Sequence, residues 1–560
     1  MARHEDDDAF VFDLVEDEGD RDAPPAPALA ELQDRAGPGA APDPEGPPAA
    51  YPADAARSSV GLRRALAAGA VLATVLGTGV AVDAMHDAAR AEEIRDVRGG
   101  VVDVSAPLDE VWEWSGVVGS RRAFVEGEGN QVAALGPLLA FESAGGLLAL
   151  RAASGEEAWT VPLGADPDCG PTGYLGWSDV ETKILVCLQG SGAAREVFTV
   201  GPDGVPSDPR VLGAEDEQRY GYARPGPDGT VLRARRVGPE PTAPEGAQCP
   251  DEGECSGTVT AGRDLLVRAE DAATGEERWR ATVPFRPMAA EGCRAGPALP
   301  WDRTDDIVRT GERLDAEGFG ARIEPALVQL WGCGFRVGVT TDGAVLPMAG
   351  VPGFGWVFGL DTGGYVAQTV AQRSDGTMDS TLFTADGDVI AQVAGSLNRP
   401  RTTDAPATAT LLSTDPPGGR LRSYTPDGAQ RWDVAVRDGS AQYLAQVDDT
   451  VVTTTWTGDV RGMDLATGAV RWTWRTASGL YDWPYESGYV SQAFTDGQSL
   501  LMLLESGSGD TELVSLDIAS GELVWDGTSS HVLTERLDTM LLAVDGNLLE
   551  VSQVGVRRLG

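Results

Sequence analysis

The feature that most constrains this chain is a seven-residue pattern, Ala-(Thr or Ser)-Gly-x-x-x-Trp, which recurs after residue 150. Four copies occupy residues 153–159, 273–279, 466–472 and 519–525, and a fifth segment, 426–432, keeps the four-residue step from Gly to Trp. An alternating apolar strand precedes each glycine and another strand begins after it, which places the tryptophan on the buried side. The pattern predicts a repeated strand, tight turn and strand with these motif residues: Gly155, Trp159, Gly275, Trp279, Gly428, Trp432, Gly468, Trp472, Gly521 and Trp525.

The turn glycines also define a period. Steps of 40 to 53 residues, and two longer steps of 71 and 68 residues, separate eight glycines: Gly155, Gly204, Gly275, Gly343, Gly387, Gly428, Gly468 and Gly521. About 40 to 50 residues make one four-stranded blade of a β-propeller, and the two long steps leave room for insertions. We expect an all-β chain with eight blades, with seven as the alternative because three of these glycines lack the tryptophan. An array of β-sandwiches is the competing fold, but it gives no reason for a Gly-to-Trp step repeated five times.

Two further expectations concern turns and ring closure. Ten Asp-Gly pairs separate the apolar runs. Asp-Gly is typical of type I′ hairpins, in which both central residues have positive φ, so we expect two-residue turns of that type. We expect the ring to close by pairing a late strand, within 540–544 or 548–551, with a segment near residues 131–150.

The repeats resemble those of the pyrroloquinoline-quinone-type (PQQ-like) β-propeller superfamily, in which the tryptophan of each blade docks against its neighbour. The resemblance covers about residues 110–558 and rests on the five Gly-to-Trp motifs. It implies a propeller fold. One branch of the superfamily holds PQQ and a calcium ion at the ring centre, whereas other members keep only the propeller and serve as binding or assembly scaffolds.

This chain lacks the features of the enzyme branch. It has neither adjacent cysteines nor a Cys-x-x-Cys-His haem site, and Asn130, Asn398 and Asn547 match no calcium-ligand context. It has no Gly-x-Ser-x-Gly elbow, and its histidines, His4, His86 and His531, are scattered. We therefore expect no catalytic residue, no metal site and no cofactor, with PQQ and calcium as the alternative.

An uncharged stretch from Ala65 to Val82 predicts one transmembrane helix. At 1.5 Å per residue such a helix reaches about 27 Å, close to the hydrocarbon thickness of a bilayer. Arg57, Arg63 and Arg64 precede it and acidic residues follow it, so the positive-inside rule places the N-terminus in the cytoplasm. A cleaved secretory signal is the alternative, but the charged region of about 60 residues before the stretch is longer than such signals carry.

The expected organisation has four parts: an acidic, Pro/Ala-rich disordered cytoplasmic tail (1–60), a transmembrane helix (61–85), a juxtamembrane linker (86–109) and an extracytoplasmic propeller (110–560). The tail carries 15 acidic residues against four arginines and has little apolar surface to offset the entropy of ordering. All six cysteines lie in the predicted extracytoplasmic part, which favours disulfides: Cys169, Cys187, Cys249, Cys255, Cys293 and Cys333. Fifteen pairings are open, and pairing of nearest neighbours is the simplest.

Charge narrows the class of partner. The chain has 86 acidic and 44 basic residues, a formal net charge of −42, which excludes nucleic acid as the default partner. We expect a membrane-anchored scaffold of the bacterial cell envelope that binds a protein or envelope ligand on its propeller face. A PQQ- and calcium-dependent envelope oxidoreductase and a sensor that signals through the tail are the alternatives. No oligomeric state is predicted.

Overall fold

The structure is a computed structural model that describes residues 92–95, 97–119, 132–172, 181–192, 195–239, 247, 255–293, 301, 317–347, 357–370, 378–415, 419–436, 442–455, 458–475, 489–505, 511–528 and 540–560. The predicted tail (1–60) and the predicted membrane helix (Ala65–Val82) lie outside the described residues. Among the helices in the described ranges, none combines the length and the apolar character needed to cross a bilayer.

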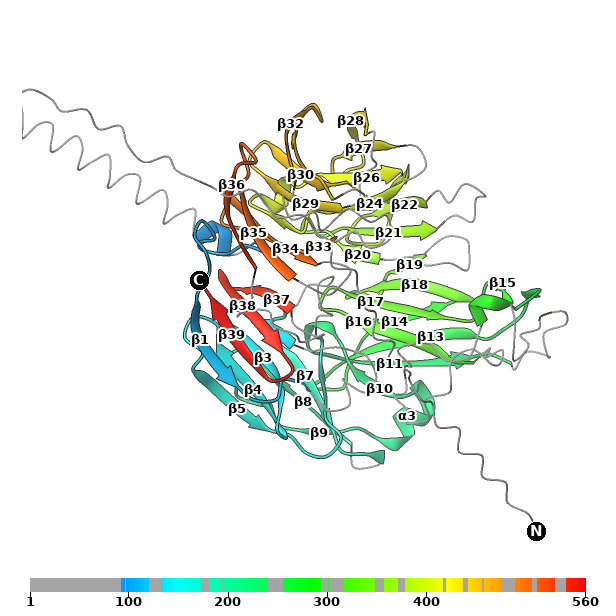
Figure 1. The fold of residues 1–560 in the computed structure, drawn as a ribbon. Helices are drawn as coiled ribbons and strands as arrows, with labels where there is room; N and C mark the ends of the chain where they lie inside the picture. Colours follow the sequence, from blue (N-terminus) through cyan, green and yellow to red (C-terminus); the bar gives the residue numbers. More distant parts are fainter. Residues whose placement is uncertain are drawn as a thin grey trace, which may run out of the picture. The chain divides into compact units, whose positions relative to one another are not determined.

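The described chain is predominantly β-structure, and nine of its sheets have four or five strands (Figure 1). Each of these sheets is one propeller blade, numbered here in chain order. Blade 1 contains β2 (Val132–Leu135), β3 (Leu138–Ser143), β4 (Gly146–Arg151) and β5 (Glu157–Pro162); blade 2 contains β6 (Asp168–Gly170), β7 (Leu185–Gln189), β8 (Glu196–Val200) and β9 (Arg210–Val211); blade 3 contains β10 (Ala223–Pro225), β11 (Thr230–Val237), β13 (Asp264–Asp271) and β14 (Glu277–Val283); blade 4 contains β16 (Phe319–Ile323), β17 (Leu327–Gly332), β18 (Phe335–Thr340) and β19 (Val345–Pro347).

The remaining blades follow the same order of strands. Blade 5 contains β20 (Val357–Gly359), β21 (Tyr365–Val370), β22 (Met378–Phe383) and β23 (Val389–Ala394); blade 6 contains β24 (Ser396–Asn398), β26 (Leu411–Asp415), β27 (Arg420–Tyr424) and β28 (Gln430–Ala435); blade 7 contains β25 (Thr402–Thr403), β29 (Gln442–Val447), β30 (Thr450–Thr454), β31 (Val460–Asp464) and β32 (Val470–Trp474); blade 8 contains β33 (Tyr489–Thr495), β34 (Ser499–Glu505), β35 (Thr511–Asp517) and β36 (Leu523–Thr528); blade 9 contains β37 (Met540–Val544), β38 (Asn547–Ser552), β39 (Gly555–Leu559) and β1 (Glu110–Ser115). Outside the blades lie the pair β12 (Thr258–Val259) and β15 (Met288–Ala289), the helix α3 (Ala214–Tyr220) and the 3₁₀ turns η2 (Pro227–Gly229), η3 (Ala290–Cys293) and η4 (Pro406–Thr408).

The all-β propeller is therefore confirmed, but the prediction of eight or seven blades is wrong, because the described sheets form nine. The eight turn glycines do mark eight blades, one each. Blade 9 has no turn between its third and fourth strands, since the third is β39 at the C-terminal end and the fourth is β1 near the start of the propeller. A count of turns misses a blade assembled from the two ends of the domain.

Ring closure follows from the same arrangement. Strand β39 pairs antiparallel with β1, with Val556 opposite Trp114 and Gly555 opposite Ser115. The expected partner near residues 131–150 is wrong, since that segment forms β2, β3 and part of β4 in blade 1. The predicted late strands are correct as strands, and they become β37 and β38 of the closing blade.

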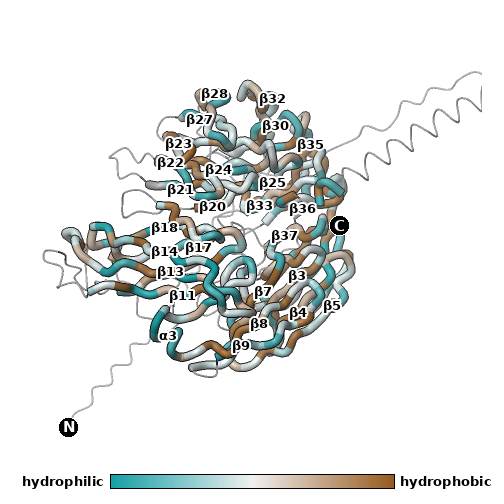
Figure 2. Tube along the Cα trace, turned by 180° about the vertical axis from the view of Figure 1, so that it is seen from behind, coloured by the Kyte–Doolittle hydropathy of each residue, from teal (hydrophilic) through white to brown (hydrophobic). Residues whose placement is uncertain are grey.

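Apolar side chains fill the seam between every two neighbouring blades. Nine of the ten apolar clusters in the described residues lie in these seams, one for each seam, and the tenth surrounds the pair β12 and β15. Leu139, Leu150 and Leu549 belong to the cluster between blades 9 and 1, and Leu501 and Leu541 to the one between blades 8 and 9. Apolar residues lie along the strands that supply these clusters (Figure 2), and β2, β34 and β38 are buried over successive residues, so both of their faces are covered. Each Å² of apolar surface removed from water contributes about 25 cal/mol of stability. The apolar surface buried on both sides of each blade therefore holds the ring together.

The expectation of type I′ turns is correct at only some of the described Asp-Gly pairs. Asp545 and Gly546 both have positive φ and form a two-residue turn, since Val544 pairs with Asn547. Asp228 and Gly229 also have positive φ, but their turn is longer, since Pro225 pairs with Val231. At Gly204, Gly343, Gly387, Gly428 and Gly497 only the glycine has positive φ. A three-residue loop with a glycine in the left-handed region gives this geometry. The dipeptide alone does not distinguish the two turn lengths.

Two of the nearest-neighbour disulfides are confirmed. Cys169 bonds to Cys187 across β6 and β7, and Cys293 bonds to Cys333, which lies between β17 and β18. Cys255 is also disulfide-bonded, and Cys249 lies outside the described residues.

The Cys293–Cys333 bond should contribute to stability because it closes a loop of 40 residues. Replacing both cysteines by serine restores the loop entropy of the unfolded chain, and we expect a loss of about 2 to 4 kcal/mol. Urea unfolding of the variant and of the wild type measures this loss. A midpoint that does not change after the double replacement would contradict the prediction.

Candidate functional site

The five predicted tryptophans link successive blades. Each indole N–H donates to a backbone carbonyl of the next blade or of the segment before β1, at 2.6 to 3.0 Å: Trp159 to Pro202, Trp279 to Thr341, Trp432 to Leu465, Trp472 to Ile518 and Trp525 to Val104. Trp112, on the closing strand β1, donates to Ala152 in the same way at 3.2 Å. This sixth tryptophan lies outside the repeat pattern, because its own blade has no motif turn.

The motif glycines lie beneath these indoles. Gly155, Gly468 and Gly521 have φ near +71°, and a Cβ on each would come within 2.4 to 2.7 Å of the ring of Trp112, Trp432 or Trp472. Gly275 and Gly428 instead face Arg210 and Ala391. Glycine is therefore required at the first three positions both by the backbone conformation and by the close approach of a ring.

An aspartate four residues before the glycine stabilises three of these turns. In blade 7, Asp464 accepts hydrogen bonds from the backbone N–H groups of Ala466 and Thr467 and from the Thr467 hydroxyl, the last at 2.7 Å, and it pairs with Arg471 at 2.6 Å. Asp271 and Asp517 make the equivalent bonds in blades 3 and 8. Sequence reasoning missed this residue, although its constant distance from the glycine is a readable signal.

Asp464 should make the stability of the propeller depend on acid pH. Its bonds to Thr467 and Arg471 lower its pKa to about 2. The pKa of an aspartate in an unfolded chain is about 3.9. A carboxylate with a lowered folded pKa stabilises the fold above the unfolded pKa and loses that contribution as the pH falls through the folded pKa. The urea midpoint of Asp464→Asn should therefore lie below that of the wild type at pH 6, and the gap should close between about pH 4 and pH 2. A gap that stays constant down to pH 2 would contradict this assignment.

The seam between blades 2 and 3 departs from the repeat. Arg210, on β9, occupies the place that tryptophan has in other blades, and its Nε donates to the Ala272 carbonyl at 2.9 Å. The apolar cluster at this seam contains seven buried residues, against twelve or thirteen at the two neighbouring seams and five or six at the three seams between blades 4 and 7. Polar side chains occupy the remaining area.

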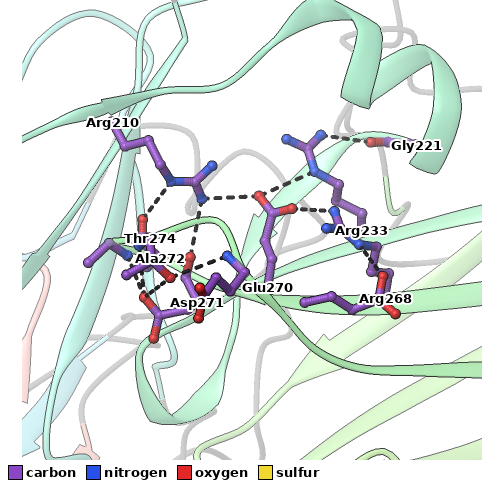
Figure 3. A network of polar contacts seen from close by, with 11 residues as sticks. Arg210, Gly221, Arg233, Arg268, Glu270, Asp271, Ala272 and Thr274 are labelled. Atoms are coloured by element: carbon purple, nitrogen blue, oxygen red, sulfur yellow. Dashed lines mark hydrogen bonds and ion pairs between the residues drawn. The ribbon is translucent and has the colours of Figure 1, made fainter.

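Glu270 lies at the centre of this polar group (Figure 3). Its side chain is 2% exposed. It accepts a hydrogen bond from Arg210 Nη2 at 3.0 Å and a short one from Arg268 Nη1, and Arg233 Nε lies 3.6 Å from its Oε1. One buried carboxylate therefore faces three guanidinium groups.

On the blade 3 side, Arg233 and Arg268 form a row across the sheet together with a further arginine, Arg280. Arg233 of β11 is directly opposite Arg268 of β13, and Arg268 is directly opposite Arg280 of β14. Like charges in directly opposed positions destabilise a sheet unless other groups compensate. Leu150, Met463 and Leu516, which are buried, stand in blades 1, 7 and 8 at the position of Glu270, five residues before the motif glycine.

Burial dominates the electrostatics of Arg233. It lowers the pKa of this guanidinium, while the charges of Glu270 and Asp216 act in the opposite direction. Its Nε and Nη2 make no hydrogen bond in the described structure. Burial also acts to lower the pKa of Arg268, but hydrogen bonding to Glu277 and the charge of Glu270 outweigh it and raise the pKa. Glu270, Glu277 and Asp216 therefore offset only part of the positive charge of the arginine row.

Helix α3 lies against this row. Tyr220 places its ring 4.3 Å from the Arg268 guanidinium and 5.5 Å from that of Arg280. Arg233 Nη1 donates to the Gly221 carbonyl at 3.2 Å, and Arg235 Nη1 donates to the Gln218 carbonyl at 3.4 Å. We call Arg233, Arg235, Arg268 and Arg280 the arginine surface.

The inner edge of the ring is occupied by the chain itself near blades 5 to 8. Strand β25 pairs parallel with β29, and Thr402 and Thr403 are fully buried there. Arg98, from the segment that precedes β1, donates to the Pro400 carbonyl at 3.0 Å and pairs with Asp361. Within the described ranges no three His, Cys, Asp or Glu side chains gather as a metal site would require. A hollow of about 10 Å³ beside Phe141 and Glu142 has room for about one water molecule.

The nine sheets make the described part of the chain a β-propeller, and a family comparison supports the predicted PQQ-like repeats. Residues 381–537, from β22 to beyond β36, match the model of the PQQ_2 family, which is described as outer membrane protein assembly factor BamB.

Solved structures with a similar chain path include BamB from Moraxella catarrhalis, at 12% identity and a TM-score of 0.34, covering 80% of this chain and 99% of that one. Saccharomyces cerevisiae Sqt1 has 9% identity and a TM-score of 0.33, covering 81% and 100%. The computationally designed Ika8 protein has 11% identity and a TM-score of 0.28, covering 71% and 99%. A comparison with curated protein sequences gives no match.

Proposed function

We propose that this chain is a single-pass membrane protein of the bacterial cell envelope whose extracytoplasmic propeller is a non-catalytic scaffold for another protein. The observation that carries the proposal is the match of residues 381–537 to a family described as an assembly factor. The disulfides Cys169–Cys187 and Cys293–Cys333 agree with an oxidising compartment. The uncharged stretch from Ala65 to Val82 supplies the proposed anchor.

Accessibility of single cysteines tests the location. In the full-length protein, Asp427→Cys lies in an exposed turn of blade 6, and Ala40→Cys lies in the tail. In intact spheroplasts a membrane-impermeant maleimide should label Asp427→Cys and should label Ala40→Cys only after permeabilisation. Labelling of Ala40→Cys alone in intact spheroplasts, or recovery of the protein outside the membrane fraction, would refute the proposed topology.

Cross-linking in living cells tests the scaffold role. A tagged full-length chain should give one envelope protein in a fixed ratio, above the level seen with the tag alone. Native mass spectrometry after incubation with PQQ and calcium tests the proposed absence of a cofactor. A bound quinone would overturn the non-catalytic part of the proposal, and the absence of any cross-linked protein would overturn the binding role.

A further inference from the structure

Helix α3 covers the arginine surface without packing into the core. None of its seven residues is buried, and no side chain caps its N-terminus. A helix this short is marginal by itself in water. The contacts that hold it are the Tyr220 ring over Arg268 and the bonds from Arg233 and Arg235 to carbonyls at its C-terminal end.

These contacts are polar rather than apolar, so they give way to a competitor of similar chemistry. The helix places three acids, Glu215, Asp216 and Glu217, one turn before Tyr220. Asp216 acts on Arg233 through its charge, and Tyr220 lies over Arg268. The direct contacts of the helix with the arginines are made by this ring and by two carbonyl oxygens, and of its acids Asp216 acts on them through charge. An aromatic ring with a carboxylate one turn before it is therefore the chemistry that fits the surface.

The exposed part of the surface is only partly neutralised, because Glu277 pairs with Arg280, whereas Arg235 bonds to a neutral carbonyl. Arg235 and Arg280 are both exposed, and Arg219 of α3 is exposed beside them. This cationic area is unusual on a chain with a net charge of −42, whose surface otherwise favours basic partners. Arginine is also the cation that best combines bidentate carboxylate binding with stacking on aromatic rings.

We propose that the arginine surface on blade 3 binds a short acidic segment of a partner protein that carries an aromatic residue, and that α3 occupies this surface until such a segment displaces it. The inference rests on the proposed scaffold role and names the chemistry of its partner. Because α3 blocks the surface, the apparent affinity for the segment is reduced by the fraction of molecules in which α3 is docked.

The experiment uses the full-length protein in detergent micelles and a fluorescein-labelled peptide with the sequence of residues 213–221, measured by fluorescence anisotropy. A second peptide with glutamine and asparagine in place of its three acids is the neutral probe. We expect the wild type to bind the acidic peptide in preference to the neutral one. Tyr220→Ala, which loosens α3, should bind the acidic peptide about fivefold more tightly.

Charge reversal at the exposed edge identifies the surface. Because Arg235 also bonds to α3, the charge is reversed in the Tyr220→Ala background, where Arg235→Glu should weaken binding of the acidic peptide about tenfold. Arg431→Glu in the same background, at an exposed arginine on β28 of blade 6, is the matched control and should bind as Tyr220→Ala alone does. Thermal melts of all variants establish that each is folded.

Equal binding of the two peptides by the wild type and by Tyr220→Ala would overturn the proposal, as would an Arg235→Glu variant that binds as the control does. These results are independent of the cross-linking experiment. A protein that binds the peptide but cross-links to nothing in cells would overturn the scaffold role in the envelope and leave the chemistry of the surface established. A protein that cross-links but ignores the acidic peptide would overturn this inference alone.

Discussion

Replacing Glu270 by alanine should destabilise the propeller by about 3 to 5 kcal/mol. The substitution removes the buried carboxylate that faces Arg210, Arg233 and Arg268. It leaves Arg210 and Arg233 without their nearest carboxylate in the seam between blades 2 and 3, and Arg268 with Glu277 alone. The loss exceeds the value of the ion pairs themselves, because the remaining charges stay desolvated. Urea unfolding of the wild type and the variant, followed by tryptophan fluorescence, measures the difference.

Glu277→Ala is the matched control for this prediction. Glu277 also binds Arg268, at 2.8 Å, but its side chain is 36% exposed. Solvent screens such a pair, so its removal should cost no more than about 1 kcal/mol. If both variants unfold at the same urea concentration, the buried Glu270 carboxylate contributes no more to stability than the exposed one of Glu277, and the prediction is wrong.

Local sequence predicts most of the ring. A glycine in the left-handed region and a tryptophan four residues later are both needed for one blade to dock against the next, so their spacing identifies the turns at Gly155, Gly468 and Gly521. It fails where the two ends of the propeller meet, because strand β1 pairs with β39 across more than 400 residues and no turn joins them. Pairing over such a separation leaves no local pattern.

The candidate site was only partly accessible from sequence. The charge of Glu270 at a position where Leu150 and Leu516 are apolar is visible once the motif glycines are aligned. The role of Arg210 is not, because it lies six residues after Gly204, whereas the motif tryptophans lie four residues after their glycines. The position of α3 is not visible in this way. Its contacts join residues of different strands through Tyr220 and two carbonyls, and they depend on the register of β11 with β13.

The second large effect concerns Trp525, whose docking differs from that of the other motif tryptophans. Its indole N–H donates at 2.9 Å to the carbonyl of Val104, which also accepts the Ser515 hydroxyl at 2.8 Å. Val104 belongs to the segment before β1, which takes the place of the missing turn of blade 9. Trp525→Ala should therefore cost about 3 to 5 kcal/mol and release this segment. Urea unfolding measures the first effect, and limited proteolysis between residues 97 and 109 measures the second.

Trp472→Ala separates these two effects. Trp472 donates at 2.9 Å to the carbonyl of Ile518, which lies in an ordinary turn of blade 8. Its removal should destabilise the propeller to a similar degree, because it leaves a comparable cavity between blades. It should leave the segment before β1 as resistant to protease as in the wild type, since Val101 and Val104 stay buried against blades 8 and 9. If both variants are cleaved there at the same rate, general loosening of the ring explains the cleavage, and Trp525 has no special part in holding the two ends of the propeller together.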